Sequence, residues 1–139
     1  MIMFTIPGEC KPKGRPKFRS TGKYVQAYTP EATQNYENFV RICFEQSGCK
    51  KYSNNEALEA VIEIHKSISS STSKKRKEQM INGVIRPITK PDVDNCAKSI
   101  LDALNKIAYN DDSRIVELIV RKVYDNDDYT KVRIKEINE

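Results

Sequence analysis

The sequence feature that most constrains the fold is a helix signal in the second half of the chain. Apolar residues recur there at three- and four-residue spacing, which is the pattern of one buried helix face: Ala97, Ile100, Leu101, Leu104 and Ile107. Asp94 is placed to cap this helix. Two β-rich runs follow at residues 115–124 and 129–137, separated by the turn signal Asp125-Asn126-Asp127-Asp128, and they predict a terminal hairpin.

The first half of the chain predicts a mixture of short strands and helices. Thr29 can cap a helix with Pro30 in its first position, and Gly48 ends it. In chain order we expect a strand at 1–6, a loop rich in Pro and Gly, a hairpin turning at Ser20-Thr21-Gly22, this helix, a strand at 57–64 and a short basic helix at 74–81 closed by Gly83. Because strands and helices do not alternate, the order predicts an α+β fold, or a mixed-sheet α/β fold, in one domain spanning residues 1–139.

The composition excludes several classes of protein. No apolar run approaches the length needed to span a bilayer, and the first residues lack the basic-then-apolar order of a signal peptide. The four cysteines, Cys10, Cys43, Cys49 and Cys96, include no C-x-x-C pair, and His65 is the single histidine. Neither a zinc site nor a disulfide framework is therefore indicated. We expect a cytoplasmic protein with reduced thiols and no membrane partner.

The charge pattern favours a polyanionic partner. Lys and Arg exceed Asp and Glu by 24 to 19, a net charge of +5. The cations concentrate in two stretches, which are the expected DNA-binding residues: Lys11, Lys13, Arg15, Lys17 and Arg19, with Lys23 close by, and then Lys74, Lys75, Arg76 and Lys77. Acidic residues gather between Asp92 and Asp128. Basic arms around an acidic centre suit a phosphodiester-cutting enzyme, because cations hold the backbone and carboxylates hold metal. Two solvated charged loops are the alternative.

Two carboxylates stand two residues apart just before the predicted helix. While the chain stays extended behind Pro91, alternation points Asp92 and Asp94 the same way. Close acids repel unless a proton or a cation such as Mg²⁺ lies between them. Asp111 or Asp112 can join the pair from the turn that follows the helix. Alternatively, Asp94 is a helix cap, Asp92 a favourable charge near the helix dipole and the second acidic pair an ordinary turn.

Lys98 lies one helical turn after Asp94 and has two possible roles. It can form an i,i+4 ion pair with Asp94, or it can contact a phosphate or leaving oxygen as a cation. His65 lies in an apolar stretch and is expected to be structural. Without a histidine base, water activated by metal is the expected nucleophile.

Together these residues resemble one known family. The run Lys-Pro-Asp-Val-Asp-Asn at 90–95, followed by Lys98, Asp102-Ala103-Leu104-Asn105 and Asp111-Asp112, is similar to the core signature of RusA-type crossover-junction endodeoxyribonucleases. Upstream, Lys13-Gly14-Arg15-Pro16-Lys17-Phe18 and Ala27-Tyr28-Thr29-Pro30 look like the N-terminal part of bacterial and phage members. The resemblance therefore covers most of the chain.

The resemblance implies a Holliday junction resolvase with a RusA-like mixed sheet. Asp92, Asp94 and Asp112 would bind Mg²⁺, with Mn²⁺ able to substitute, and Lys98 would be a catalytic cation. Asp111 remains the alternative third ligand, and Lys90 would contact a phosphate. No organic cofactor is implied.

The family also implies a homodimer that acts on branched DNA in recombination, repair or phage DNA processing. A four-way junction has approximate two-fold symmetry, so two matched nicks call for two active sites related by a two-fold axis. A flap- or fork-specific nuclease on the same scaffold and a non-catalytic protein that binds branched DNA are the alternatives.

Overall fold

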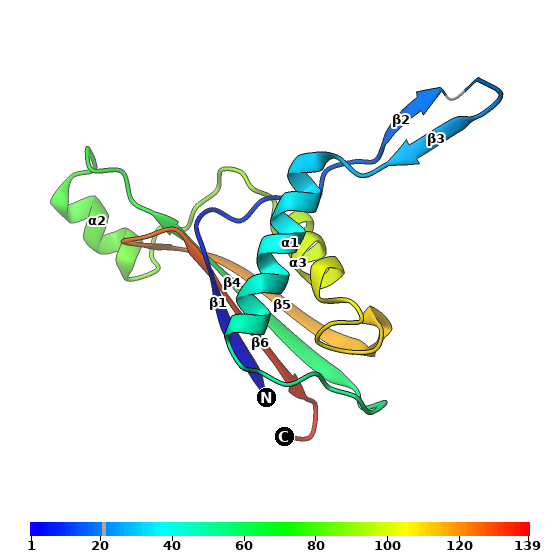
Figure 1. Cartoon of the computed structure of the whole chain (residues 1–139). Helices are drawn as coiled ribbons and strands as arrows, with labels where there is room; N and C mark the ends of the chain where they lie inside the picture. The colour runs from blue at the N-terminus through cyan, green and yellow to red at the C-terminus, as the bar shows by residue number, and fades with distance from the viewer. Residues whose placement is uncertain (21) are drawn as a thin grey trace.

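A four-stranded sheet with two helices against one face forms the body of the molecule (Figure 1). The computed structural model describes residues 1–20 and 22–139. In chain order its elements are β1 (Ile2–Pro7), β2 (Lys17–Ser20), β3 (Val25–Tyr28), α1 (Glu31–Gln46), β4 (Leu58–Ser67), α2 (Lys74–Ile81), α3 (Val93–Leu104), the 3₁₀ turn η1 (Asp112–Arg114), β5 (Ile115–Asp125) and β6 (Tyr129–Glu136). The expected α+β class with a mixed sheet in one domain is confirmed.

The strands of the main sheet run in the order β1-β6-β4-β5. The β1–β6 and β6–β4 pairs are antiparallel, and the β4–β5 pair is parallel. Strand β4 lies inside the sheet between β6 and β5, and both of its faces are buried, with Ile62 on the helix side and Val61 and His65 on the other. The parallel β4–β5 pair requires a long crossover connection, and that connection carries α3.

The expected terminal hairpin is wrong. β5 and β6 do not pair with each other, because β4 lies between them and pairs with both. The turn after Asp125 is where the sequence places it, but it carries the chain across the end of β4. A local turn signal does not reveal which strand is the neighbour, whereas a strand that buries both faces must lie inside the sheet.

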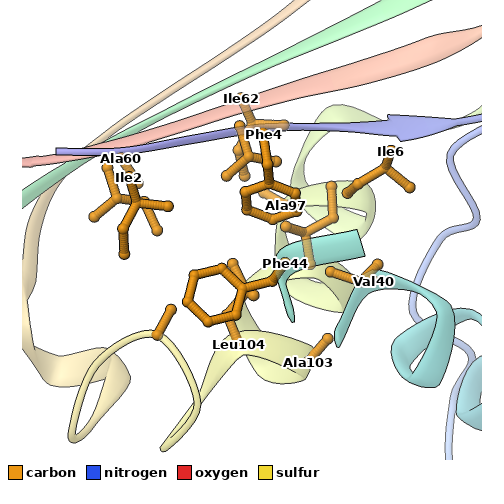
Figure 2. Close-up of a cluster of buried hydrophobic side chains, with 14 of the residues drawn as sticks. Ile2, Phe4, Ile6, Val40, Phe44, Ala60, Ile62, Ala97, Ala103 and Leu104 are labelled. Carbon is orange, nitrogen blue, oxygen red and sulfur yellow. The ribbon is translucent and has the colours of Figure 1, made fainter. Parts of the chain in front are cut away.

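The hydrophobic core lies between the sheet and helices α1 and α3 (Figure 2). Phe4 of β1 and Phe44 of α1 meet edge to face with ring centroids 5.7 Å apart. Val40, Ile62 and Leu104 are completely buried, and they come from α1, β4 and α3. Because this core holds α3 against the sheet, it also fixes the position of the α3 N-terminus.

The ends of the two long helices differ from the sequence expectation. Pro30 is the residue before the first turn of α1, not inside it, and no side chain caps that helix, so Thr29 is not a cap. Helix α3 ends at Leu104 and not at Ile107, because Asn105 leaves the helical region with a ψ of 128° and Lys106 then adopts a positive φ of 66°. Among the residues described, no helix combines the length and apolar character needed to cross a membrane.

Strands β2 and β3 form a hairpin, here called the arm, that stands away from the body (Figure 1). All residues of both strands are exposed. The hairpin is confirmed, although Thr21 of its predicted turn lies outside the described residues.

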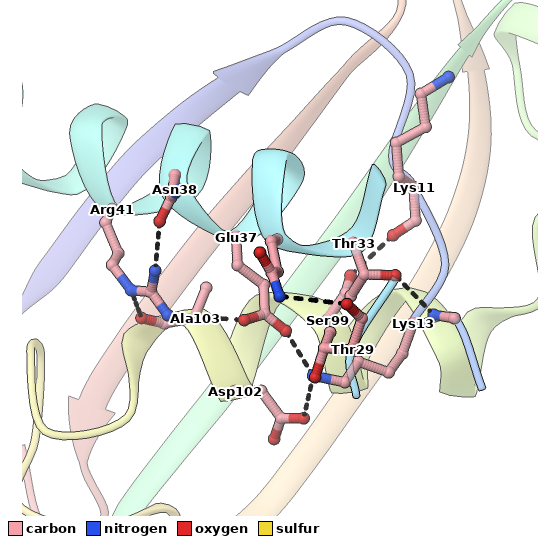
Figure 3. Close-up of polar contacts among 12 residues, drawn as sticks. Lys11, Lys13, Thr29, Thr33, Glu37, Asn38, Arg41, Ser99, Asp102 and Ala103 are labelled. Atoms are coloured by element: carbon pink, nitrogen blue, oxygen red, sulfur yellow. Dashed lines mark hydrogen bonds and ion pairs between the residues drawn. The ribbon is translucent and has the colours of Figure 1, made fainter. Parts of the chain in front are cut away.

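The base of the arm is held to helices α1 and α3 by polar contacts (Figure 3). The Lys13 ammonium pairs with Glu37 of α1 and, at 3.2 Å, with Asp102 of α3. The amide of Gly14 donates to Thr33 Oγ1 at 3.0 Å, and a Cβ on Gly14 would lie 2.6 Å from that oxygen. Burial lowers the pKa of Lys13, but the hydrogen bonds to both carboxylates leave that pKa raised overall. Lys13 therefore serves as an anchor for the arm.

Candidate active site

Helix α3 begins two residues earlier than expected, and this changes how its two acids are presented. Asp92 is the residue before the first turn, and its carbonyl accepts the first helical hydrogen bond from the Cys96 amide at 3.1 Å. Its carboxylate caps no helical N–H, although Asn95 Nδ2 contacts it at 3.4 Å. Asp94 lies inside the first turn, so it is not the cap. The two acids are therefore not carried by one extended segment, and alternation does not align them.

Two lysines from neighbouring strands hold the segment just before Asp92. Lys66 of β4 donates to Thr89 Oγ1 at 2.6 Å and to the Lys90 carbonyl at 3.0 Å. Lys122 of β5 donates to the Thr89 carbonyl at 2.6 Å and to the Pro91 carbonyl at 3.1 Å. We call this pair the lysine clamp. It fixes the backbone from which Asp92 and α3 begin.

The lysine clamp was not predicted, although the sequence carries a signal for its two lysines. Along β5, Lys122 continues the alternation of Leu118 and Val120, so it lies on the face that packs toward α3. Lys66 continues Ile62 and Ile64 of β4 in the same way. A lysine at an inward-facing strand position needs partners, and here the partners are backbone carbonyls.

A groove of about 500 Å³ separates α3 from β5 and collects the charged residues of both regions. Its apolar floor is formed by Val93, Ala97, Leu101, Ile115, Leu118 and Val120. Its charged lining is formed by Asp94, Lys98, Asp102 and Asp112. The turn after α3 has thus returned the second acidic cluster to the side of the first.

Three of the four charged residues in the groove are not engaged by the protein. Asp102 pairs with Lys13 at 3.2 Å. Within residues 1–20 and 22–139, the side chains of Asp94, Lys98 and Asp112 have no hydrogen bond or ion pair. The i,i+4 ion pair between Lys98 and Asp94 is therefore not formed. Two carboxylates and an ammonium are left available to a ligand.

Asp111 and Asp112 have different surroundings. The Asp111 carboxylate accepts hydrogen bonds from the Ser113 amide, at 3.2 Å, and from the Ser113 hydroxyl. These bonds, first of all the one from the hydroxyl, lower the pKa of Asp111. The amide of Asp112 donates to Asn105 Oδ1 at 3.1 Å, which fixes its backbone while its carboxylate lines the groove. Asp111 thus shapes the turn and Asp112 faces the groove.

Asp92 lines a different pocket from Asp94 and Asp112. That pocket, of about 380 Å³, is also lined by Lys11, Lys90 and both residues of the lysine clamp. In the part of the chain that the structure describes, no three Asp, Glu, His or Cys side chains lie close enough together to hold a metal ion. The expectation that three carboxylates meet in one small pocket is therefore not met within a single chain.

His65 is structural, as expected. Its ring is buried and stacks on Tyr129 with centroids 4.1 Å apart. Nδ1 lies 2.9 Å from Asp125 and Nε2 lies 2.7 Å from Glu63. Tyr129 donates to the same Asp125, and this bond is the main reason why the pKa of Asp125 is lowered. Both ring nitrogens are engaged, so His65 is not free to act as a base.

Apart from Lys13, which anchors the arm, the predicted DNA-binding cations divide into three places. Arg15, Lys17 and Arg19 are exposed on or beside the arm, where Arg19 lies 5.1 Å from the centroid of the Tyr28 ring. Residues 74–77 form the first turn of α2, at the other end of the molecule from the arm (Figure 1). Lys11 and Lys90 line the pocket of Asp92, where Lys11 pairs with Glu9 at 3.4 Å.

Comparison with known proteins identifies the class. The family model of the endodeoxyribonuclease RusA matches residues 7–135, which include every residue of the groove and of the lysine clamp. The chain belongs to the RusA endodeoxyribonuclease family, which is a family of nucleases. The chain is also similar to the uncharacterized protein YqaN of Bacillus subtilis (strain 168), with 33% identity over 139 residues that cover 99% of this chain and 97% of YqaN.

Proposed function

We propose that this protein is a Mg²⁺-dependent endonuclease that resolves four-way DNA junctions by paired, symmetric nicks. The observation that carries the proposal is the groove between α3 and β5, which Asp94, Lys98 and Asp112 line without a side-chain partner among the described residues. Metal-dependent cleavage of a phosphodiester needs negative and positive side chains at one place, because the carboxylates hold the metal and the ammonium faces the phosphate. Membership of the RusA family supports the same reaction.

The donor set of the groove suits Mg²⁺. Carboxylate oxygens are its preferred protein ligands, and one or two of them suffice when phosphate oxygens and water complete the shell. In this proposal Asp94 and Asp112 hold the ion, and Asp92, whose carboxylate caps nothing, is the third acid from the adjoining pocket. Bound Mg²⁺ supplies charge neutralisation and a more acidic water at neutral pH. We expect Mn²⁺, which takes the same oxygen ligands, to substitute.

The exposed cations are proposed to grip the junction. Arg15, Lys17 and Arg19 on or beside the arm and residues 74–77 on α2 lie at opposite ends of the molecule, and α3 and β5, whose residues line the groove, lie between these ends (Figure 1). Such contacts to phosphates read the shape of a branched substrate more than its sequence. Lys13 is excluded from this set because two carboxylates already hold its ammonium.

A cleavage assay on a synthetic mobile four-way junction tests the proposal. We expect nicks at symmetric positions on two opposite strands with Mg²⁺ or Mn²⁺, and intact strands when EDTA replaces the metal. Mapping the cuts on each of the four strands distinguishes paired nicking from random nicking. Intact junctions at every metal concentration would overturn the proposal.

The same assay separates the alternatives. A flap- or fork-specific enzyme cuts those substrates faster than the four-way junction, and a non-catalytic binding protein retains the junction without cutting it.

For Asp92→Asn we expect cleavage to be abolished while junction affinity stays near wild type or increases, since a carboxylate that repels phosphate has been removed. Loss of affinity together with cleavage would count against a catalytic role for Asp92.

Removing one half of the lysine clamp is expected to slow cleavage. Lys122→Met removes both hydrogen bonds to the segment before Asp92, and groups that orient metal ligands typically change metal affinity or activity about 10- to 100-fold. Single-turnover cleavage should fall by about tenfold, the Mg²⁺ concentration for half-maximal rate should rise, and Lys122→Arg should recover part of the loss. The exposed Lys131→Met loses the same charge on β6 and should cleave like wild type.

A further inference from the structure

The arm presents two faces of different chemistry. Successive side chains of a strand point to opposite sides, and paired residues of neighbouring strands share a side. One side, here called the apolar face, is formed by the pairs Phe18–Ala27 and Ser20–Val25. The opposite side, here called the basic face, is formed by the pairs Lys17–Tyr28 and Arg19–Gln26. The apolar face carries no charge, and both cations of β2 lie on the basic face.

The apolar face is uncovered. Phe18 and Val25 are 69% and 66% exposed, and the ring of Phe18 meets no other ring or cation among the described residues. The arm stands away from the body, so there is no core beneath this face (Figure 1). A two-stranded hairpin is only marginally stable by itself, and covering its apolar side chains is favourable. The apolar face is therefore available to a ligand.

The charge of the arm indicates which ligand suits it. Residues 10–30 contain six Lys or Arg side chains and no Asp or Glu. A ligand that covers the apolar face also meets this positive potential, so charge complementarity favours a polyanion over the apolar surface of another protein. Nucleic acid combines negative charge with flat apolar groups. In a duplex the faces of the bases are stacked on each other, so only unpaired bases can offer a face to an aromatic ring.

The basic face is suited to the phosphates of the same ligand. Arg19 lies 5.1 Å from the centroid of the Tyr28 ring, a cation–π contact that holds the guanidinium, and Lys17 is exposed beside it. At a branch point of DNA, the backbone of a duplex and unpaired bases lie next to each other. A ribbon with one face for phosphates and one face for bases matches that arrangement.

The base of the arm is connected to the groove. Lys13 pairs at 3.2 Å with Asp102, and Asp102 lines the groove together with Asp94 and Lys98. The hydrogen bond from the Gly14 amide to Thr33 holds the same segment to α1. Because the arm begins at the wall of the groove, a nucleotide on the arm and a phosphate in the groove can belong to one DNA branch point.

We propose that Phe18 stacks on an unpaired base at the branch point while Lys17 and Arg19 contact phosphates on the other face of the arm. Phe18 is then a specificity-determining residue, because stacking requires an unpaired base and phosphate contacts do not. The inference rests on the proposed function in taking branched DNA as the substrate. Its test uses neither metal nor cleavage, so its failure and that of the nuclease proposal are distinguishable.

Two DNA probes of equal length and charge test the stacking. Each is a duplex with a gap of two unpaired nucleotides, which carry adenines in one probe and are abasic in the other. In EDTA, we expect wild-type protein to bind the adenine probe about tenfold more tightly, which is the typical size of the contribution from stacking one base on an aromatic side chain. Equal affinity of wild-type protein for both probes overturns the proposal.

Variants of the apolar face assign the preference to the Phe18 ring. Phe18→Leu keeps an apolar side chain without the ring, so the affinity ratio of the two probes should fall to about one while affinity for the abasic probe is unchanged. Phe18→Trp should retain the ratio. Val25→Ser is the matched control, because Val25 is similarly exposed on the same face without a ring, and it should also retain the ratio. Loss of the ratio in Val25→Ser, or equal weakening of both probes by Phe18→Leu, overturns the proposal.

Two further measurements separate the faces and the possible ligands. Lys17→Met on the basic face should weaken both probes by the same factor and leave their ratio unchanged. Without DNA, wild-type protein and Phe18→Leu should sediment alike. A change of association state in Phe18→Leu would show that protein covers the apolar face, and would overturn the proposal.

Discussion

Replacing Asp112 with Asn is expected to reduce junction cleavage by about 1000-fold while junction affinity is kept. The substitution removes a charged group that acts at the reacting phosphate, but it leaves the shape of the protein surface unchanged. Asp112 lines the groove with Asp94 and Lys98, and its carboxylate has no internal partner among the described residues. The substitution therefore removes no contact that stabilises the fold. Single-turnover rates on a four-way junction, measured beside the binding constant in Ca²⁺ or EDTA, give both quantities.

Asp111→Asn is the matched control for this variant. The Asp111 carboxylate is held by Ser113 and shapes the turn, so its loss should lower the thermal midpoint slightly and leave the cleavage rate within a few fold of wild type. This pair of variants also decides between the two acids that the sequence leaves open. A larger loss of cleavage in Asp111→Asn than in Asp112→Asn would assign the role to Asp111 and contradict the proposed site.

Local sequence patterns predicted the elements but not all of their partners. The apolar spacing from Ala97 to Ile107 found α3, although the helix ends at Leu104, and α2 spans the predicted residues 74–81 before Gly83. The predicted pairing of β5 with β6 was wrong, because the neighbour of a strand depends on residues that are distant in the sequence. Here β4, with both faces buried, lies between β5 and β6, and its short run of mixed apolar and acidic residues does not predict this position.

For the candidate site, spacing along the chain located the acids but not their directions. Asp94 and Asp112 do meet in one groove with Lys98, as a returning turn allows. Asp92 points into the neighbouring pocket, because the helix starts directly after it and ends the extended geometry that alternation assumes. The alternation along β4 and β5 marks Lys66 and Lys122 as inward-facing, but the backbone carbonyls that they bind lie far away in the chain and carry no sequence signal, so the lysine clamp was not predicted.

The second large effect is expected for Lys98. Lys98→Met keeps the length of the stem and removes the charge, and loss of one preorganised donor to a reacting group typically costs about 100- to 1000-fold in rate. We expect a loss of about 100-fold in single-turnover cleavage. Helical stability should be almost unchanged, because Lys98 forms no ion pair with Asp94 or any other residue that the structure describes. Lys98→Arg retains the charge and should recover part of the rate.

Three measurements distinguish a role of Lys98 in the reaction from a role in general DNA attraction. Lys51→Met removes an exposed positive charge that does not line the groove, so it should change affinity and salt dependence slightly and leave the rate on bound junction unchanged. Lys98→Met should show the opposite pattern, with a slow rate even when all of the junction is bound. If saturating protein restores the wild-type rate, Lys98 acts by attracting DNA. The groove then holds the metal without a cation at the phosphate.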